Sequence, residues 1–137
     1  MINLYTETNF CHKYEKEFIN WLQNCINSRN FKEDEINYIF VDDVYLHKMN
    51  MDYLQHDTYT DIITFDYSVG KTLSADIYIS VDRIRENSEI YKTEFYTELA
   101  RVMIHGILHL MKYKDKTENE KKQMRKQEDI CLSQLKF

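Results

Sequence analysis

Two histidines four positions apart are the residues whose types and spacing most clearly allow chemistry. His105 and His109 lie in the most apolar stretch of the chain, where the spacing of apolar residues predicts a helix. Residues four apart project from the same face of a helix, so two imidazole nitrogens can bind one metal ion. Such a pair also occurs as ordinary packed side chains, and the spacing alone leaves both interpretations open.

Gly106 directly follows the first histidine and narrows the possible chemistry. In zinc proteases with a His-Glu-x-x-His helix, a glutamate at this position acts as general base, so peptide hydrolysis by that route is disfavoured. A glycine inside a helix costs about 1 kcal/mol relative to alanine, and it therefore needs a reason. Either it lets a backbone or a substrate come close, or it permits tight packing between helices.

The periodicity of apolar residues predicts the elements that must position this pair. We expect an α/β (α+β) fold in which a small mixed four-stranded sheet packs with about five helices, and in which the metal site lies on a buried helix. Strands 62–67 and 75–81 should pair antiparallel across a hairpin loop. The full predicted order is a strand at 2–5, a helix from 14, a strand at 35–41, a helix after 42–43, strands at 62–67 and 75–81, and helices at 82–91, 93–110 and from 117 onward.

The final helix carries a further candidate. Thr117 and Glu120 form a capping box, in which each side chain satisfies a backbone donor of the other residue, and this pattern predicts the start of the helix. Glu128 falls on the apolar stripe of the same helix with Met124 and Cys131. A buried carboxylate usually has a partner, so Glu128 could orient a ligating histidine from behind; an ordinary salt bridge is the alternative.

Three more residues are candidates for a part in the site or its surroundings. Glu98 and Arg101 precede His105 on nearly the same helix face, and we expect them to form an ion pair with each other. Asp61 opens a strand after a turn, where either an active-site role or local capping would explain it. Thr93 is the expected N-cap of the histidine helix.

Length and composition limit the class of protein. With 137 residues, 43% hydrophobic and 30% charged, the chain should fold as a single domain over 1–137 and should not be disordered. We find no apolar run long enough to cross a membrane and no signal peptide, so the protein should stay where it is made. Three cysteines without a Cys-x-x-Cys pair argue against a disulfide framework. The net charge of −5 has the wrong sign for binding nucleic acid by charge alone, so any RNA contact must be local.

The sequence around the histidines resembles a known family. Residues 105–115 read HGILHLMKYKD and are similar to the signature His-Gly-x-Leu-His-Leu-x-Gly-Tyr-Asp-His of the YbeY family of bacterial rRNA maturation factors. Residues 60–65, 74–80 and 124–128 resemble further segments of that family in the same order. The resemblance implies a cytoplasmic, zinc-dependent, single-strand-specific endoribonuclease. It also implies a role in processing the 3′ end of small-subunit rRNA and in ribosome quality control, with rRNA, ribosomal subunits or ribosome-associated proteins as partners.

The chain departs from the family signature at its proposed third metal ligand. The family has a histidine six residues after the second one, whereas this chain has Asp115. A carboxylate is an acceptable zinc ligand, so we expect His105, His109 and Asp115 to hold one Zn²⁺ ion. An anionic ligand should leave that ion less electrophilic than a third histidine would. The alternative is that Asp115 only caps the last helix.

Other family positions also differ. Lys112 stands where the family has the glycine that ends the helix, and Lys114 stands where it has an aspartate; both lysines could meet a phosphate or could be solvated surface charges. Leu54 occupies the position of a family arginine, so no arginine role carries over. The general base is not identified, and Asp61 and Glu128 are the candidates.

Two other functions remain open from the sequence. The chain could be a non-catalytic ribosome-assembly factor that keeps a structural zinc, and the missing histidine and arginine favour that possibility. It could also be a zinc hydrolase of another bond, although the missing glutamate after His105 weakens this alternative.

Overall fold

The computed structural model describes residues 1–56 and 58–137. In these residues the elements follow the predicted order of strands and helices. The strands are β1 (Ile2–Thr6), β2 (Lys32–Val41), β3 (Ile62–Asp66) and β4 (Thr72–Ser80), and the helices are α1 (Glu15–Ser28), α2 (Asp43–Leu54), α3 (Val81–Ile90), α4 (Phe95–Leu110) and α5 (Glu118–Leu132).

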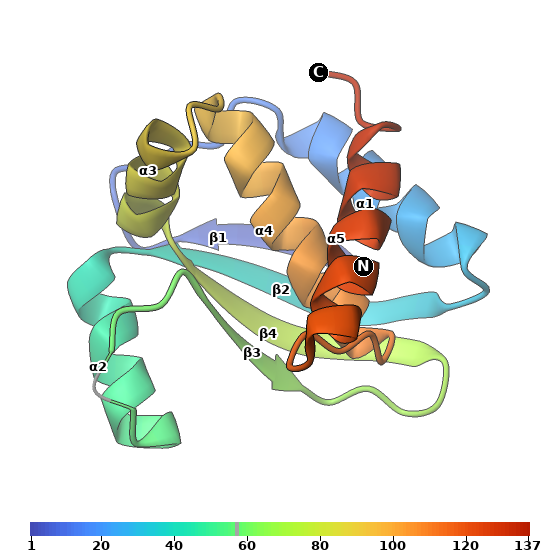
Figure 1. The fold of residues 1–137 in the computed structure, drawn as a ribbon, viewed down its shortest axis with the longest axis horizontal. Helices are drawn as coiled ribbons and strands as arrows, with labels where there is room; N and C mark the ends of the chain where they lie inside the picture. Colours follow the sequence, from blue (N-terminus) through green and yellow to red (C-terminus); the bar gives the residue numbers. More distant parts are fainter. Residues whose placement is uncertain (57) are drawn as a thin grey trace.

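The strands form one mixed sheet in the spatial order β1-β2-β4-β3 (Figure 1). The strands β1, β2 and β4 run parallel to one another, and β3 pairs antiparallel with β4, as expected for a hairpin. The pairing places Ile79 of β4 opposite Phe40 of β2 on one side and opposite Ile62 of β3 on the other. The expected α/β fold with a small mixed sheet and five helices is therefore confirmed for the described part of the chain.

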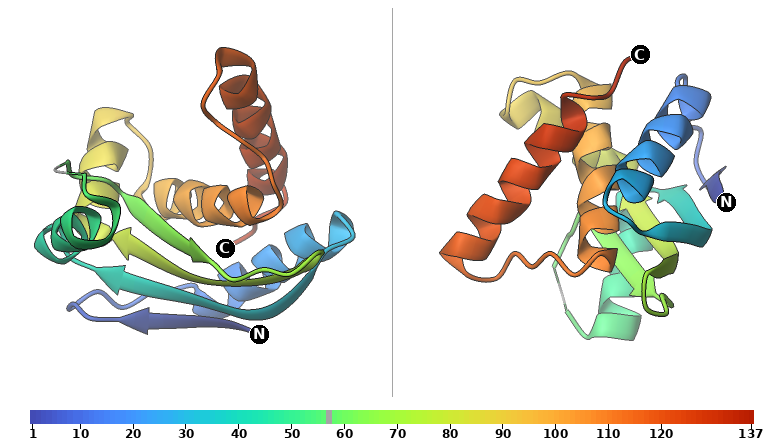
Figure 2. Two further views of the ribbon diagram at one scale, coloured as in Figure 1. Left: turned by 90° about the horizontal axis from the view of Figure 1, so that it is seen from below. Right: turned by 90° about the vertical axis from the view of Figure 1, so that its right-hand side faces the viewer.

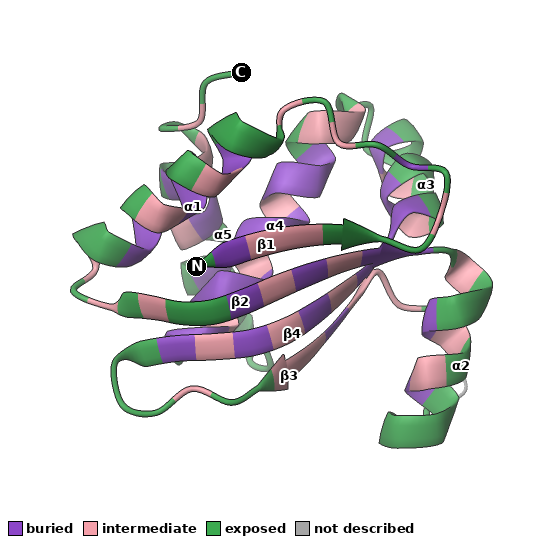
Figure 3. Cartoon of the chain, turned by 180° about the vertical axis from the view of Figure 1, so that it is seen from behind, coloured by how far each residue is buried: buried purple, intermediate pink, exposed green. Residues whose placement is uncertain are grey.

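Helices cover one face of the sheet and leave most of the other face open. Figure 2 shows α1, α4 and α5 on the same side of the sheet, with the long axis of α5 standing away from the strands. Seen from behind, the strands are uncovered except at one end, where α2 lies (Figure 3). There, Leu46 of α2 joins Val41 and Ile63 in a second, smaller apolar cluster. The main core lies on the helix-covered face.

Helix α4 is the buried helix that carries the histidine pair. Ten of its residues are buried, including Leu99, Met103 and Ile107. A Cβ atom at Gly106 would lie 3.1 Å from Cδ1 of Ile62 and 3.4 Å from Cδ1 of Ile77. Gly106 therefore permits close packing of the helix on strands β3 and β4, rather than on another helix or a substrate.

The first four helices each end at a residue other than glycine in the left-handed conformation. These residues are Asn30, Gln55, Lys92 and Lys112, with φ between 55° and 77°. Glycine is the usual residue at this position, because it has no Cβ to clash, but the chain has only two glycines. After α4, the backbone N–H groups of Lys112 and Tyr113 donate to the carbonyls of His109 and Leu108. Lys112 thus ends the helix in the glycine's place, at the cost of backbone strain.

The helix starts were predicted correctly in one case and wrongly in another. Thr117 and Glu120 form the expected capping box at the start of α5. The N-cap of α4, however, is Glu94 and not Thr93. The backbone N–H of Thr93 instead donates to the carbonyl of Ser88, because the link from α3 is so short that Thr93 still belongs to the end of that helix. Among the described residues, no helix combines the length and the apolar character required to pass through a bilayer.

Candidate metal centre

Three side chains from two adjoining segments converge at the C-terminal end of α4. His105 and His109 project from α4, and Asp115 lies in the turn between α4 and α5. The Nε2 atoms of the two histidines are 3.0 Å apart. Each of them lies 3.3 Å from Oδ2 of Asp115. The three candidate ligands predicted from the sequence are therefore brought together, and this group could hold a metal ion.

The separations match those of one tetrahedral ion. With bonds of about 2.0–2.1 Å and angles near about 109°, two ligand atoms of zinc lie about 3.3–3.4 Å apart. The observed values of 3.0, 3.3 and 3.3 Å are close to this spacing. Their side chains remain 24%, 36% and 36% exposed for His105, His109 and Asp115, so a fourth ligand position can reach solvent or a substrate.

The turn after α4 sets the position of Asp115. Lys112 reverses the chain at the helix end, and Tyr113 packs against the main core. The capping box at Thr117 then starts α5 two residues after Asp115. Because Thr117 is the N-cap, Asp115 does not cap the helix, and its carboxylate faces the histidines instead.

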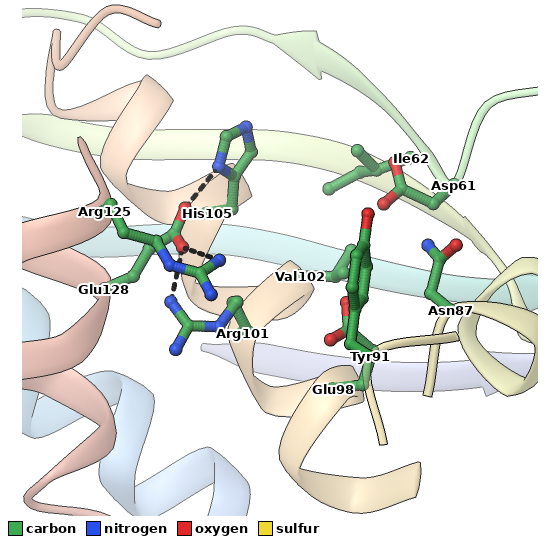
Figure 4. Close-up of a pocket in the computed structure, with 10 residues that line it drawn as sticks. All are labelled: Asp61, Ile62, Asn87, Tyr91, Glu98, Arg101, Val102, His105, Arg125 and Glu128. Atoms are coloured by element: carbon green, nitrogen blue, oxygen red, sulfur yellow. Dashed lines mark hydrogen bonds and ion pairs between the residues drawn. The ribbon is translucent and has the colours of Figure 1, made fainter. Parts of the chain in front are cut away.

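Glu128 of α5 lies directly behind the first histidine. Its Oε2 atom is 2.7 Å from Nδ1 of His105, and its Oε1 atom accepts a 2.8 Å hydrogen bond from Arg101 (Figure 4). When Nδ1 of His105 carries the proton and donates to the carboxylate, the lone pair of Nε2 points to the other two ligands. The structure therefore places Glu128 where it can orient His105.

Burial and pairing act against each other on these two side chains. Burial alone would raise the pKa of Glu128, but hydrogen bonds from His105 and Arg101 outweigh it and lower the pKa below its ordinary value. Burial alone would lower the pKa of His105, but the hydrogen bond and charge of Glu128 outweigh that and raise it. The shift of Glu128 favours its charged carboxylate, and the shift of His105 favours its protonated imidazole.

The expected ion pair between Glu98 and Arg101 is wrong. Arg101 instead donates 2.8 Å hydrogen bonds to Glu128 and to Asp129 of α5. The reason lies in the packing of the two helices. Helix α5 crosses next to α4 and places two carboxylates at the two ends of the Arg101 guanidinium, whereas Glu98 on the same helix could offer only one. Glu98 is left buried and without that partner.

A pocket of about 450 Å³ opens beside His105 (Figure 4). Asp61 lies in its wall, near the metal-ligand group, and burial raises the pKa of this carboxyl group although the charge of His105 opposes the shift. The residues that line the pocket come from the start of β3, from α3 and its end, and from α4 and α5: Asp61, Ile62, Asn87, Tyr91, Glu98, Arg101, Val102, His105, Arg125 and Glu128. This flanking pocket makes the region beside the candidate ligands large enough for a small ligand.

Comparison with known proteins gives the chain a family. The family described as Endoribonuclease YbeY matches residues 2–136. The chain belongs to the YbeY family. An endoribonuclease YbeY from Christiangramia forsetii is 51% identical over 93% of this chain and 90% of that protein. One from Karelsulcia muelleri is 49% identical over 99% of this chain and 96% of that protein.

A solved structure also has this fold. The solution structure of TM1509 from Thermotoga maritima aligns with a TM-score of 0.73 and 24% identity, over 97% of this chain and 87% of that one. At this identity the likeness concerns the fold alone. The relatives that carry the endoribonuclease name are those found by sequence.

Several residues of this YbeY-family pocket were not found by sequence reasoning. Asn87 and Tyr91 stand at the end of α3, and Arg125 stands one turn before Glu128 on α5. Arg125 shares the helix face of Glu128 at a spacing of three, which is a signal that could have been used. Asn87 and Tyr91 offered no such signal, because only the packing of α3 against α4 brings them to the pocket.

Proposed function

We propose that this YbeY-family chain is a zinc-dependent, single-strand-specific endoribonuclease. In this proposal His105, His109 and Asp115 hold one zinc ion, and the substrate is rRNA, with the small-subunit 3′ end as its processing site. We further propose that it acts in the cytoplasm, in ribosome maturation and quality control, together with ribosomal subunits or ribosome-associated proteins. The observation that carries the proposal is the spacing of 3.0–3.3 Å between three donor atoms in a chain whose sequence relatives are endoribonucleases.

The residues around the group have distinct parts in this proposal. A bound zinc ion would act as a Lewis acid toward a phosphodiester and would lower the pKa of water. Glu128, held by Arg101, would keep His105 in the tautomer that leaves Nε2 free. Asp61 would accept or hold a proton at its carboxylate, since burial raises its pKa toward the range useful to a general base.

The charge of the chain bears on how it would meet RNA. The net charge of −5 does not favour strong binding of a free polyanion. Lys112 and Lys114 flank Tyr113 in the turn that leads to Asp115 and could meet a phosphate there, and the Nζ atom of Lys112 lies 3.9 Å from the Asp66 carboxylate. This local arrangement supports action within a ribosomal particle, where other contacts supply the affinity.

The test combines metal content with cleavage. The protein, purified without added metal, should contain about one zinc per chain and should cleave single-stranded RNA but not a duplex of the same sequence. His109→Ala and Asp115→Ala should lose both zinc and cleavage, whereas the exposed Glu118→Gln should keep both. Cleavage that survives both ligand substitutions would contradict the proposal. Bound zinc without any cleavage would indicate the non-catalytic assembly factor instead.

A further inference from the structure

The flanking pocket contains a buried carboxylate without a partner. Glu98 is only 8% exposed, yet its carboxylate makes no hydrogen bond or ion pair with any residue in the part of the chain that the structure describes. Burial raises the pKa of this group above its ordinary value. The carboxylate lines the pocket and has no partner among the described residues, so its oxygens are available to a ligand that donates hydrogen bonds.

An aromatic ring stands over the same pocket. Tyr91 follows the end of α3 and is 65% exposed, and within residues 1–56 and 58–137 its ring has no aromatic neighbour. Figure 4 shows its side chain extending along the pocket, with the hydroxyl end toward Asp61. Exposed aromatic faces of this kind stack on unpaired bases in proteins that bind single-stranded RNA.

The remaining walls limit what the ligand can be. Val102 and Ile62 supply apolar surface, and Arg125, whose side chain is 64% exposed, supplies a cation at the rim. Carboxyl groups from Asp61, Glu98 and Glu128 line the interior, and the one arginine there, Arg101, already donates to Glu128 and Asp129, so a phosphate is disfavoured inside. The volume of about 450 Å³ is within the range of small-molecule sites. A flat heterocycle that donates hydrogen bonds meets these conditions.

Among the four bases of RNA, guanine matches a carboxylate best. Its Watson–Crick edge presents two neighbouring donors, N1–H and the N2 amino group, to the two oxygens of one carboxylate. Adenine and cytosine each pair a donor with an acceptor on that edge, and uracil has one N–H between two carbonyls. An acceptor beside a carboxylate oxygen is repelled, so these three bases are disfavoured.

We propose that the flanking pocket binds an unpaired guanine base of the RNA, with Tyr91 against its face and Glu98 accepting hydrogen bonds from its edge. The inference rests on the proposed function, because it assigns a base specificity to the same site. Arg125 then lies at the mouth of the pocket, where it can meet the phosphate next to that base. The pocket adjoins His105, so the bound guanine would lie beside the bond to be cleaved.

The experiment uses four single-stranded oligonucleotides that differ only in one base, which is G, A, C or U. For the zinc-loaded protein, kcat/KM should be highest for G, by roughly 5-fold to 100-fold over the other bases, as expected for a bidentate base contact. Glu98→Gln replaces one acceptor with a donor, so it should lower the value for G about 10-fold or more and raise those for A and C. Glu89→Gln, an exposed carboxylate of α3 outside the pocket, is the matched control and should change none of them.

Tyr91 supplies a second, independent measurement. Tyr91→Ala should raise KM for every oligonucleotide about 5-fold to 10-fold, and Tyr91→Phe should not, because the ring and not the hydroxyl does the stacking. Melting temperatures should show that all variants fold. An unchanged base preference in Glu98→Gln, in a protein that still cleaves RNA, would overturn the inference while leaving the nuclease proposal intact.

Binding of free nucleotides tests the guanine site even if the protein does not cleave RNA. Guanosine monophosphate should bind more tightly than adenosine monophosphate, and Glu98→Gln should abolish that difference. If this holds and no RNA is cleaved, then the pocket is a guanine site and the nuclease proposal fails. Equal binding of the two nucleotides by the unmodified protein, together with equal cleavage of the four oligonucleotides, would refute the guanine site.

Discussion

Replacing Glu128 by glutamine should weaken metal binding without removing any of the three proposed ligands. Glu128 accepts hydrogen bonds on both sides, from His105 at 2.7 Å and from Arg101 at 2.8 Å. Glutamine has a single side-chain acceptor and adds an N–H₂ group that can only donate. One of the two donors must therefore face the amide nitrogen and lose its acceptor, and the negative charge behind the imidazole is lost in either orientation.

The expected size follows from this change. Removing the hydrogen-bonded partner of a ligating histidine typically lowers metal affinity about 10-fold to 100-fold, which corresponds to about 1.4–2.7 kcal/mol. Arg101 keeps its 2.8 Å hydrogen bond to Asp129, so the guanidinium is not left entirely unpaired. The loss should therefore appear mainly in the affinity for zinc and less in the stability of the metal-free protein.

Competition with a chromophoric zinc chelator measures this affinity directly. Asp129→Asn is the matched control, because it removes a carboxylate that contacts the same arginine but does not touch His105. The control should bind zinc within about 2-fold of the unmodified protein, a change of at most about 0.4 kcal/mol. If Glu128→Gln folds and binds zinc as tightly as the control, then Glu128 does not orient the ligand, and the reasoning is refuted.

Three further predictions concern the turn, the third ligand and the buried acid. Lys112→Gly should stabilise the protein by about 1 kcal/mol in urea unfolding, because the left-handed conformation strains a residue with a Cβ and the exposed contact with Asp66 contributes little. Lys112→Ala keeps the strain and should give no gain in stability. A gain with alanine would show that the strain is not the cause. Asp115→His should retain about one zinc per chain, whereas Asp115→Ala should lose at least about 10-fold in affinity; equal affinities would exclude Asp115 as a ligand. Glu98→Gln should be more stable than the unmodified protein at pH 7, and this difference should shrink as the pH falls toward 4. The reason is that burial raises the folded-state pKa of Glu98, so the cost of burying its charge disappears once it is protonated. A stability difference that does not depend on pH would contradict this explanation.

Much of the fold could be predicted from local patterns. Alternating residues such as Ile77, Tyr78 and Ile79 indicated strand β4, and the helical spacing of the apolar residues around His105 indicated the buried helix α4. The capping box at Thr117 marked the start of α5 correctly. These features depend on side chains close together in the sequence, so the sequence contains all the information that they need.

The failed prediction for Arg101 and the open question about Gly106 both depended on contacts between distant segments. Arg101 pairs with carboxylates on α5 and not with Glu98 on its own helix, and the spacing of residues within α4 does not indicate where α5 crosses it. The role of Gly106 was open until the side chains of Ile62 and Ile77 were placed against it.

The histidine pair and its helix could be predicted from the spacing of residues 105–110, since a helix dictates which side chains share a face, whereas Asp115 became a candidate ligand only through the family resemblance. Only the tertiary structure placed the Asp115 carboxylate 3.3 Å from both imidazoles and put Glu128 behind one of them. It alone assembled the flanking pocket from α3, α4, α5 and β3. The physical reason is that sequence spacing determines geometry within one rigid element, whereas the distances between elements result from how all of their side chains pack together.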